Sequence, residues 1–294
     1  IRVAYLQIIN PDMLVKEGDM RSLRVQEIPT ARGMISDRMG RPLAVSVPVN
    51  AVWADPKELA DKGGVGDDTR WRALSEALNI PLEQVKSKVT ANPKGRFVYL
   101  ARQVNPTIGD YVKKLNLPGI YLQAESKRYY PSGSVTAHII GVTNIDDEGI
   151  EGVEKSFDRW LTGVPGQRTV RKDRGGRVIE DTIARESQAG HNLTLSIDER
   201  LQALVYREIS SAVALNKAES GTAILVDVNT GEILAMANSP SYNPNNLQGT
   251  PKDAMRNRAI TDIFEPGSTV KPLVVMTALN EKLIKPNDLV NTYP

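Results

Sequence analysis

The sequence contains no cysteine and only two histidines, His138 and His191, among 294 residues. Without cysteine the chain can form no disulfide framework, no thiolate nucleophile and no cysteine-ligated zinc or iron–sulfur site. Two histidines exclude a three-histidine metal site, and we expect no bound metal or cofactor. Neither histidine lies in a motif that needs an imidazole, so structural roles are expected for both.

Long apolar runs and an excess of one charge are also missing. No window approaches the roughly 18 consecutive apolar residues of a membrane-spanning helix. The 37 basic and 35 acidic side chains leave a net charge of +2, so no overall field favours nucleic acid, and no nucleic-acid partner is expected. Residues 171–174 (RKDR) are interrupted by an acid and are expected in a solvated loop. Residues 1–9 are typical of a strand or a juxtamembrane segment, with a single membrane anchor expected upstream.

The composition, 40% apolar and 24% charged, is that of a folded chain long enough for two domains. Residues 162–192 are polar, contain glycines and lack a helical stripe, which indicates a linker or an exposed hairpin. We place a first domain at residues 1–188 and a second at residues 189–294.

The first half carries short local signals. Residues 32–44 place two strand-like pieces around Asp37, Arg38 and Gly40, a hairpin pattern. Apolar spacing predicts helices over 68–78, 81–89 and 108–115, and the first of these places Trp71, Leu74 and Leu78 on one face. That face is expected in a core or in a groove for a partner. Arg32, Asp37 and Arg38 are expected in a buried ion pair that holds the first domain together, with a ligand site or partner contact as the alternatives.

The second half predicts a helix followed by a hairpin, which favours an α+β fold. Ser196 and Glu199 have the spacing of a capping box, and the apolar stripe that follows predicts a helix ending near Asn216. Residues 222–228 and 232–238 read as strands joined by the turn formers at 229–231.

A serine and a lysine near the end could carry chemistry. In the segment EPGSTVKP, Ser268 lies just after a Pro-Gly pair and Lys271 follows three residues later, which places both on one face of a helix start. Pro272 is tolerated only in a first turn, and the apolar run 273–279 predicts a buried helix after it. Backbone N–H groups at such a terminus can stabilise an oxyanion, and the lysine could accept the serine proton.

Two considerations limit this pattern. A lysine amine with an ordinary pKa of ~10.4 is neutral in only about one molecule in 2,500 at pH 7, so a lysine base needs burial or a neighbouring cation. Composition alone also predicts about one Ser-x-x-Lys match in a chain of this kind. The interpretation therefore depends on the surrounding sequence.

The surrounding sequence resembles the class B penicillin-binding proteins, whose serine–lysine motif matches Ser268 and Lys271. The similarity covers nearly the whole chain, in ordered blocks, and FEPGSTVKP, SPSYNPN and YLQII most resemble the division-specific branch of the family. The other blocks are RGMISDRMGRPLA (32–44), RYYPSGSVTAHIIGVTN (128–144), GIEGVEKSFD (149–158), LTGVPG (161–166) and LSIDERLQ (195–202).

The resemblance implies an elongated non-catalytic N-terminal domain, followed by the first part of a serine β-lactamase-like transpeptidase domain with an antiparallel sheet and packed helices. It implies peptidoglycan D,D-transpeptidation at the septum, with Ser268 as nucleophile and Lys271 as general base. The substrates would be a D-Ala-D-Ala stem peptide as donor and a diaminopimelate amine as acceptor, and β-lactams would acylate the same serine. It also implies docking to a lipid-II polymerase and other division proteins, on the periplasmic side of the inner membrane.

The sequence departs from the family pattern after the nucleophile. Neither Ser-x-Asn nor Lys-[Thr/Ser]-Gly follows Lys271, and the triplet Ser241-Tyr242-Asn243 precedes Ser268 in a family block of its own. We therefore expect an incomplete site and little acylation of this chain alone. Two alternatives stay open: an interaction module that docks division proteins without catalysis, and a serine β-lactamase or β-lactam sensor, which would not need the long first domain.

Overall fold

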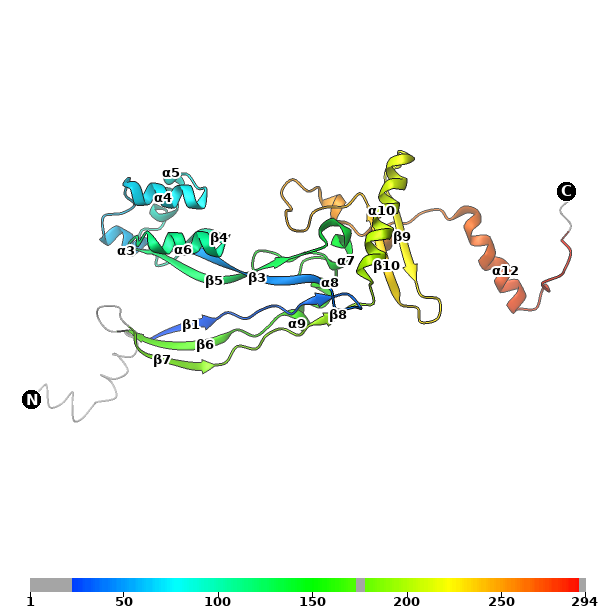
Figure 1. The fold of residues 1–294 in the computed structure, drawn as a ribbon, viewed down its shortest axis with the longest axis horizontal. Helices are drawn as coiled ribbons and strands as arrows, with labels where there is room; N and C mark the ends of the chain where they lie inside the picture. Colours follow the sequence, from blue (N-terminus) through cyan, green and yellow to red (C-terminus); the bar gives the residue numbers. More distant parts are fainter. Residues whose placement is uncertain (1–22, 173–177, 291–294) are drawn as a thin grey trace, which may run out of the picture.

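The computed structural model describes residues 23–172 and 178–290. The molecule is elongated (Figure 1). For description we call residues 23–188 the N-terminal region, which splits into two prongs, and residues 189–290 the C-terminal region. We call the prong made of strands β1, β6 and β7 the arm and the prong that carries helices α3 to α6 the head. The mixture of helices and antiparallel strands is the α+β class expected from the sequence. No helix in the described ranges is long and apolar enough to cross a membrane, and residues 1–9 lie outside those ranges.

The arm is a three-stranded antiparallel sheet. Strands β6 (Gly166–Lys172) and β7 (Val178–Arg185) form a hairpin, and β1 (Leu23–Ile28) adds to the other edge of β6. The polar stretch 162–192 thus contains the exposed hairpin that its composition allowed. Of the RKDR run, Arg171 and Lys172 lie in β6, whereas residues 173 and 174 are outside the described residues.

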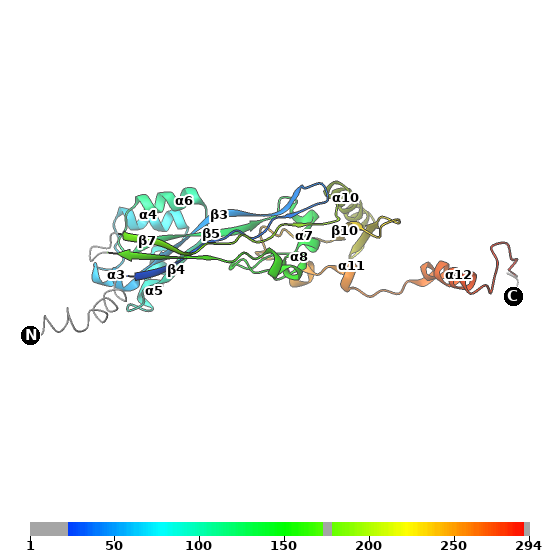
Figure 2. The ribbon, with the colours of Figure 1, turned by 90° about the horizontal axis from the view of Figure 1, so that it is seen from below.

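The head is a helix-covered sheet built around one long strand. Strand β3 (Pro42–Ala54) pairs over residues 45–54 with β5 (Ile120–Tyr129) and near its end with β4 (Val98–Val104), both antiparallel. Helices α3 (Pro56–Asp61), α4 (Thr69–Leu78), α5 (Leu82–Thr90) and α6 (Pro106–Lys114) lie on one side of this sheet (Figure 1). Seen from below, α4 and α6 lie toward one edge of the head and α3 and α5 toward the other (Figure 2). Alternate residues of a strand point to opposite faces, so the helix-covered face buries a core. That core comprises Val52, Ala54, Leu59, Trp71, Leu74, Val85, Val89, Leu100, Val112 and Leu117.

The predicted helices of the head are confirmed, with local caps that explain their limits. The Asp68 side chain accepts from the backbone N–H groups of Arg70 and Trp71 at the start of α4, and Asn79 ends that helix in a left-handed conformation with φ of 52°. Trp71 and Leu74 are buried in the core and Leu78 packs against it, so this face belongs to the protein interior.

Where the two regions meet, short elements surround a second core; we call this part the junction. Strand β2 (Ile35–Ser36) turns through residues 37–41 into β3, which confirms the hairpin, and β8 (Leu193–Thr194) runs parallel to β2. Helices α7 (Ala137–Ile140), α8 (Gly152–Ser156) and α9 (Asp158–Leu161) and the 3₁₀ turn η2 (Gly133–Val135) complete it. The core residues are Ile35, Leu43, Ala44, Tyr130, Ala137, Ile140, Val142, Leu161 and Tyr242.

A buried ionic cluster joins the segment before β2 and strand β5 to α8. The Nε atoms of Arg32 and Arg128 each lie 2.7 Å from a different carboxylate oxygen of Glu154, which is fully buried. The expectation of a buried ion pair is thus correct for Arg32, but its partner is Glu154 and not Asp37. Asp37 accepts backbone N–H groups and lies 3.8 Å from Nη1 of Arg41, whereas Arg38 lies at the surface beside Glu232.

The C-terminal region packs a helix on a hairpin. Helix α10 (Glu199–Leu215) lies against β10 (Ile233–Ser239) and β9 (Gly221–Val226), which pair antiparallel, and it ends at Asn216 as predicted. The predicted capping box of Ser196 and Glu199 is wrong, because Glu199 is the first residue of α10. Asp198, not Ser196, caps α10 through a bond from the Arg200 N–H, because the Ser196 hydroxyl donates to the Ile233 carbonyl and thereby holds β10.

Candidate active site

The EPGSTVKP segment folds into two consecutive helical pieces. The 3₁₀ turn η4 (Gly267–Val270) leads into α12 (Lys271–Asn280), and Pro272 lies in the first turn of α12, where its missing N–H costs nothing. Gly267 has a φ of +57°, a left-handed conformation that glycine adopts easily after Pro266. The carbonyl of Ser268 accepts the N–H of Lys271, so the two residues belong to one turn at the start of the helix.

The structure brings Ser268 and Lys271 into the same turn but does not join their side chains. Both residues are exposed, and among the described residues no hydrogen bond or ion pair involves the Ser268 hydroxyl or the Lys271 amine. A lysine serves as a base when burial or a neighbouring cation favours its neutral form. The described part of the chain leaves Lys271 without burial, so the arrangement offers a nucleophile position and a nearby amine but not a closed site.

Helix α12 differs from the buried helix that the apolar run predicted. Leu273 is 60% and Met276 62% exposed, and none of the residues of α12 is buried. Figure 1 shows α12 lying apart from the sheet of the C-terminal region, connected to it by an extended segment. The run is apolar, as the sequence shows. Among the described residues, however, no other part of the chain packs against α12 and buries it.

The triplet Ser241-Tyr242-Asn243 has structural roles. The Ser241 hydroxyl donates to the Ser134 carbonyl at 2.7 Å, and the buried Tyr242 donates its hydroxyl to the Ala137 carbonyl at 3.0 Å. Asn243 accepts the N–H of Asn245 in a local turn. These bonds fasten the segment after β10 to the junction.

Both histidines also have structural surroundings. His138 is buried, its Nε2 lies 2.8 Å from the Ala254 carbonyl oxygen, and burial lowers its pKa. The ring of His191 lies on that of Trp160 with 4.5 Å between centroids. No group of acidic residues or histidines within the described residues could hold a metal ion.

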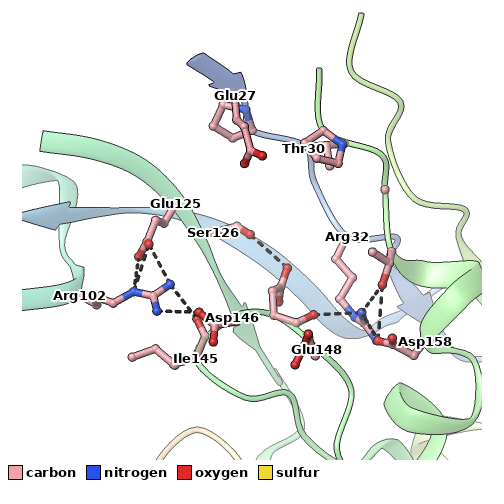
Figure 3. Close-up of a pocket in the computed structure, with 15 residues that line it drawn as sticks. Glu27, Thr30, Arg32, Arg102, Glu125, Ser126, Ile145, Asp146, Glu148 and Asp158 are labelled. Atoms are coloured by element: carbon pink, nitrogen blue, oxygen red, sulfur yellow. Dashed lines mark hydrogen bonds and ion pairs between the residues drawn. The ribbon is translucent and has the colours of Figure 1, made fainter. Parts of the chain in front are cut away.

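A polar cavity that the sequence did not indicate lies between the arm and the head (Figure 3). It has a volume of about 380 Å³ and is lined by the end of β1, by β5 and by the loop at 145–148. Arg102 bonds Glu125 at 2.8 Å and Asp146 at 2.7 Å, while Arg32 bonds Asp158 at 2.7 Å. Both guanidinium groups in the lining are therefore already paired with carboxylates. The lining residues are far apart in the sequence, so no local pattern indicates the cavity.

Comparison with known proteins places these features in a family. Residues 27–195, more than half of the chain, match the model described as the penicillin-binding protein dimerisation domain. The chain belongs to the penicillin-binding proteins. A second model, the penicillin-binding protein transpeptidase domain, matches residues 221–294, a range that contains Ser268 and Lys271.

Relatives of this penicillin-binding protein carry the name peptidoglycan D,D-transpeptidase FtsI. The chain is 73% identical over 293 residues to the protein of that name from Escherichia coli K12. It is 54% identical over 294 residues to the one from Buchnera aphidicola subsp. Schizaphis graminum. The alignment covers all of the chain but 50% of the first relative and 52% of the second, so the chain spans about half of their length.

Two solved structures share the fold. A peptidoglycan synthetase from Bifidobacterium adolescentis superposes with a TM-score of 0.58 at 25% identity, covering 92% of this chain and 54% of that one. Penicillin-binding protein 2X from Streptococcus thermophilus superposes with a TM-score of 0.62 at 23% identity, covering 90% of this chain and 43% of that one. Together with the α+β architecture, these likenesses agree with the fold expected from the sequence.

Proposed function

We propose that this penicillin-binding protein acts in peptidoglycan D,D-transpeptidation at the division septum, with Ser268 as nucleophile and Lys271 as general base. The observation that carries the proposal is the turn Gly267–Val270, which places Ser268 directly before α12 with Lys271 as the first residue of that helix. The names of the relatives support the reaction class, and the match of residues 221–294 to the transpeptidase model supports the position of the site.

The proposed reaction has two acyl-transfer steps. In the first, the Ser268 oxygen attacks the carbonyl carbon of the penultimate D-alanine of a stem peptide, and its proton passes to the Lys271 amine. The peptide C–N bond breaks and the terminal D-alanine leaves with that proton on its amine. In the second, a diaminopimelate amine attacks the ester, the C–O bond breaks, and the serine oxygen regains a proton. A β-lactam acylates Ser268 through the same first step, but its opened ring stays attached.

The proposal divides the chain between two tasks. Residues 1–188 form the non-catalytic domain and residues 189–294 the start of the transpeptidase domain. We place the protein at the periplasmic face of the inner membrane, where its substrate is. Lys271 needs further residues to favour its neutral form, so this chain alone has little or no activity.

Labelling with a fluorescent penicillin tests the nucleophile. In a protein with a complete transpeptidase domain, Ser268→Ala abolishes covalent labelling, whereas Ser241→Ala, at the serine of the competing triplet, keeps it. Lys271→Met slows labelling, because the serine loses its proton acceptor. If Ser268→Ala still labels, the assignment is wrong, and steady hydrolysis of the penicillin favours the β-lactamase or sensor alternative.

A second candidate function is docking of division proteins by the N-terminal region. An aromatic row crosses the helix-free face of the head sheet: the rings of Trp53 and Tyr121 stack at 4.7 Å, and Phe97 lies 4.9 Å from Trp53. Phe97 is 46% and Tyr121 40% exposed, and large aromatic side chains dominate the energetics of protein interfaces. This surface lies at the end of the molecule opposite α12 (Figure 1).

Binding to a lipid-II polymerase tests this second function. In a Ser268→Ala background, Tyr121→Ser lowers the affinity, because the aromatic row loses one of its two exposed rings. The matched control is Tyr111→Ser, an equally exposed tyrosine on α6 at the helix-covered face. Equal affinities for the two variants would exclude the aromatic row as the docking surface.

A further inference from the structure

One buried carboxylate of the N-terminal region reaches into the C-terminal region. Asp37, in the turn between β2 and β3, is fully buried, and its Oδ1 accepts the N–H groups of Met39 at 2.9 Å and Arg41 at 2.7 Å. Its Oδ2 accepts the N–H of Glu199, the first residue of α10, at 3.0 Å. A helix N-terminus leaves such N–H groups without partners, so the N-terminal region itself completes the start of α10.

One turn further along α10, Gln202 bonds both regions at once. Its side chain is fully buried, and its Nε2 donates to the Val135 carbonyl at 2.7 Å and to the Met236 carbonyl at 2.9 Å. Its Oε1 accepts the Met236 N–H at 2.7 Å. One amide therefore connects η2 of the N-terminal region, helix α10 and strand β10, with both of its donor hydrogens used.

The contacts continue from β10 toward the serine–lysine turn. Asn238, two residues after Met236, accepts the N–H of Ala259 at 2.9 Å and donates to Asn257 at 2.9 Å. These bonds hold α11 (Arg258–Thr261), from which the chain runs on to Ser268. Hydrogen bonds thus link the turn at 37–41 to α10, α10 to β10, and β10 to α11.

We propose that Gln202 is a positioning residue that fixes the orientation of the C-terminal region relative to the head and arm. Domains in one chain usually move relative to one another unless their interface is extensive. Here each bond that opens leaves a buried polar group unsatisfied, which disfavours any hinge motion at residues 189–195. A displacement of the N-terminal region is therefore passed to β10 and α11. The inference rests on the proposed function only where it treats Ser268 as the nucleophile.

Pulsed electron-spin distance measurement tests the proposal without reference to acylation. The chain has no cysteine of its own, so cysteines placed at Gln123 on β5 and Asn229 in the turn before β10, both exposed, take one spin label in each region. The parent chain gives one narrow distance distribution. Gln202→Met, which keeps the length of the side chain but removes all three hydrogen bonds, gives a broadened or double distribution.

The controls separate positioning from general stability. Leu74→Ala removes a fully buried side chain from the head core, lowers the melting temperature and leaves the distribution narrow. Asp37→Asn, a milder change that removes one of the two carboxylate acceptors, broadens the distribution less than Gln202→Met and serves if that variant does not fold. A distribution that stays single and narrow in both Gln202→Met and Asp37→Asn, despite lower melting temperatures, overturns the proposal. Failure of Ser268→Ala to abolish penicillin labelling would leave this result unchanged.

Discussion

Glu154 offers a direct test of what holds the N-terminal region together. Its two carboxylate oxygens each accept from one guanidinium, with Nε–O distances of 2.7 Å to Arg32 and Arg128, and all three side chains are at most 2% exposed. Glu154→Gln keeps the shape of the side chain but removes its charge, and it turns one acceptor oxygen into a donor that faces a guanidinium. Breaking one partner of a buried ion pair costs about 3–5 kcal/mol.

The size of this loss makes it measurable, since domains are stable by only about 5–15 kcal/mol. All three tryptophans of the chain, Trp53, Trp71 and Trp160, lie in the N-terminal region, so urea unfolding followed by tryptophan fluorescence reports on that region. We expect the midpoint to fall steeply in Glu154→Gln. The control is Glu83→Gln, the same change at an exposed pair with Lys86, where we expect about 0–1 kcal/mol.

The residual contacts of the two arginines decide how the result is interpreted. Arg32 keeps bonds to Asp158 and to the Glu154 carbonyl, and Arg128 keeps a bond to the Gly33 carbonyl at 2.6 Å. These bonds hold the guanidinium groups in place, so their charge cannot move to water without opening the junction. A loss for Glu154→Gln as small as that for Glu83→Gln would refute the claim that the cluster holds the junction together.

Three further predictions concern single residues. Burial raises the pKa of Asp147, so its ionised form costs stability at pH 7, and Asp147→Asn raises the melting temperature there; the difference vanishes below about pH 4, where the unfolded chain is also protonated. Burial lowers the pKa of His138, so the unfolded chain binds more protons below about pH 6.5, and thermal scans show a shallower loss of stability on acidification in His138→Gln than in the parent. Gly141 has a φ of +76°, and a Cβ added there would lie 1.9 Å from the Glu151 carbonyl oxygen, so Gly141→Ala lowers the free energy of unfolding in urea by about 2–5 kcal/mol. Gly40 has a φ of +81° but open space around it, so Gly40→Ala lowers that free energy by only about 1–2 kcal/mol. A lower melting temperature for Asp147→Asn at pH 7 would contradict the first prediction. The second would be contradicted if His138→Gln and the parent lost stability equally on acidification, and the third if the two glycine variants lost equal stability.

Local signals predicted the helices of the head well, because their causes are local. Asp68 and Asn79 limit α4 through bonds to residues at most four positions away, and Trp71 and Leu74 define its buried face by spacing alone. The hairpin at 32–44 and the end of α10 at Asn216 follow from the same kind of short-range chemistry.

Contacts between distant residues were the part that could not be predicted. Nothing in residues 23–28 indicates that they pair with residues 166–171, and nothing near Arg32 indicates that its partner is Glu154, 122 positions away. Ser196 was taken as the cap of α10 because of its spacing to Glu199, but its hydroxyl bonds Ile233 from a neighbouring strand. For Ser268 and Lys271, the motif and its helix start were predictable, and their roles remain proposals. The apolar run of α12 indicated burial, but burial also depends on what packs against a helix.

Strand β3 has a consequence for how the length of this molecule can vary. Its 13 residues run unbroken from the junction to the head, and residues 45–54 pair in constant register with β5, so a single strand of roughly 40 Å acts as a spacer between the two ends. Inserting one residue would turn the buried row of the head toward water. A change in the length of this spacer that keeps the buried row in place without a bulge therefore needs an even number of residues, added or removed in both strands together.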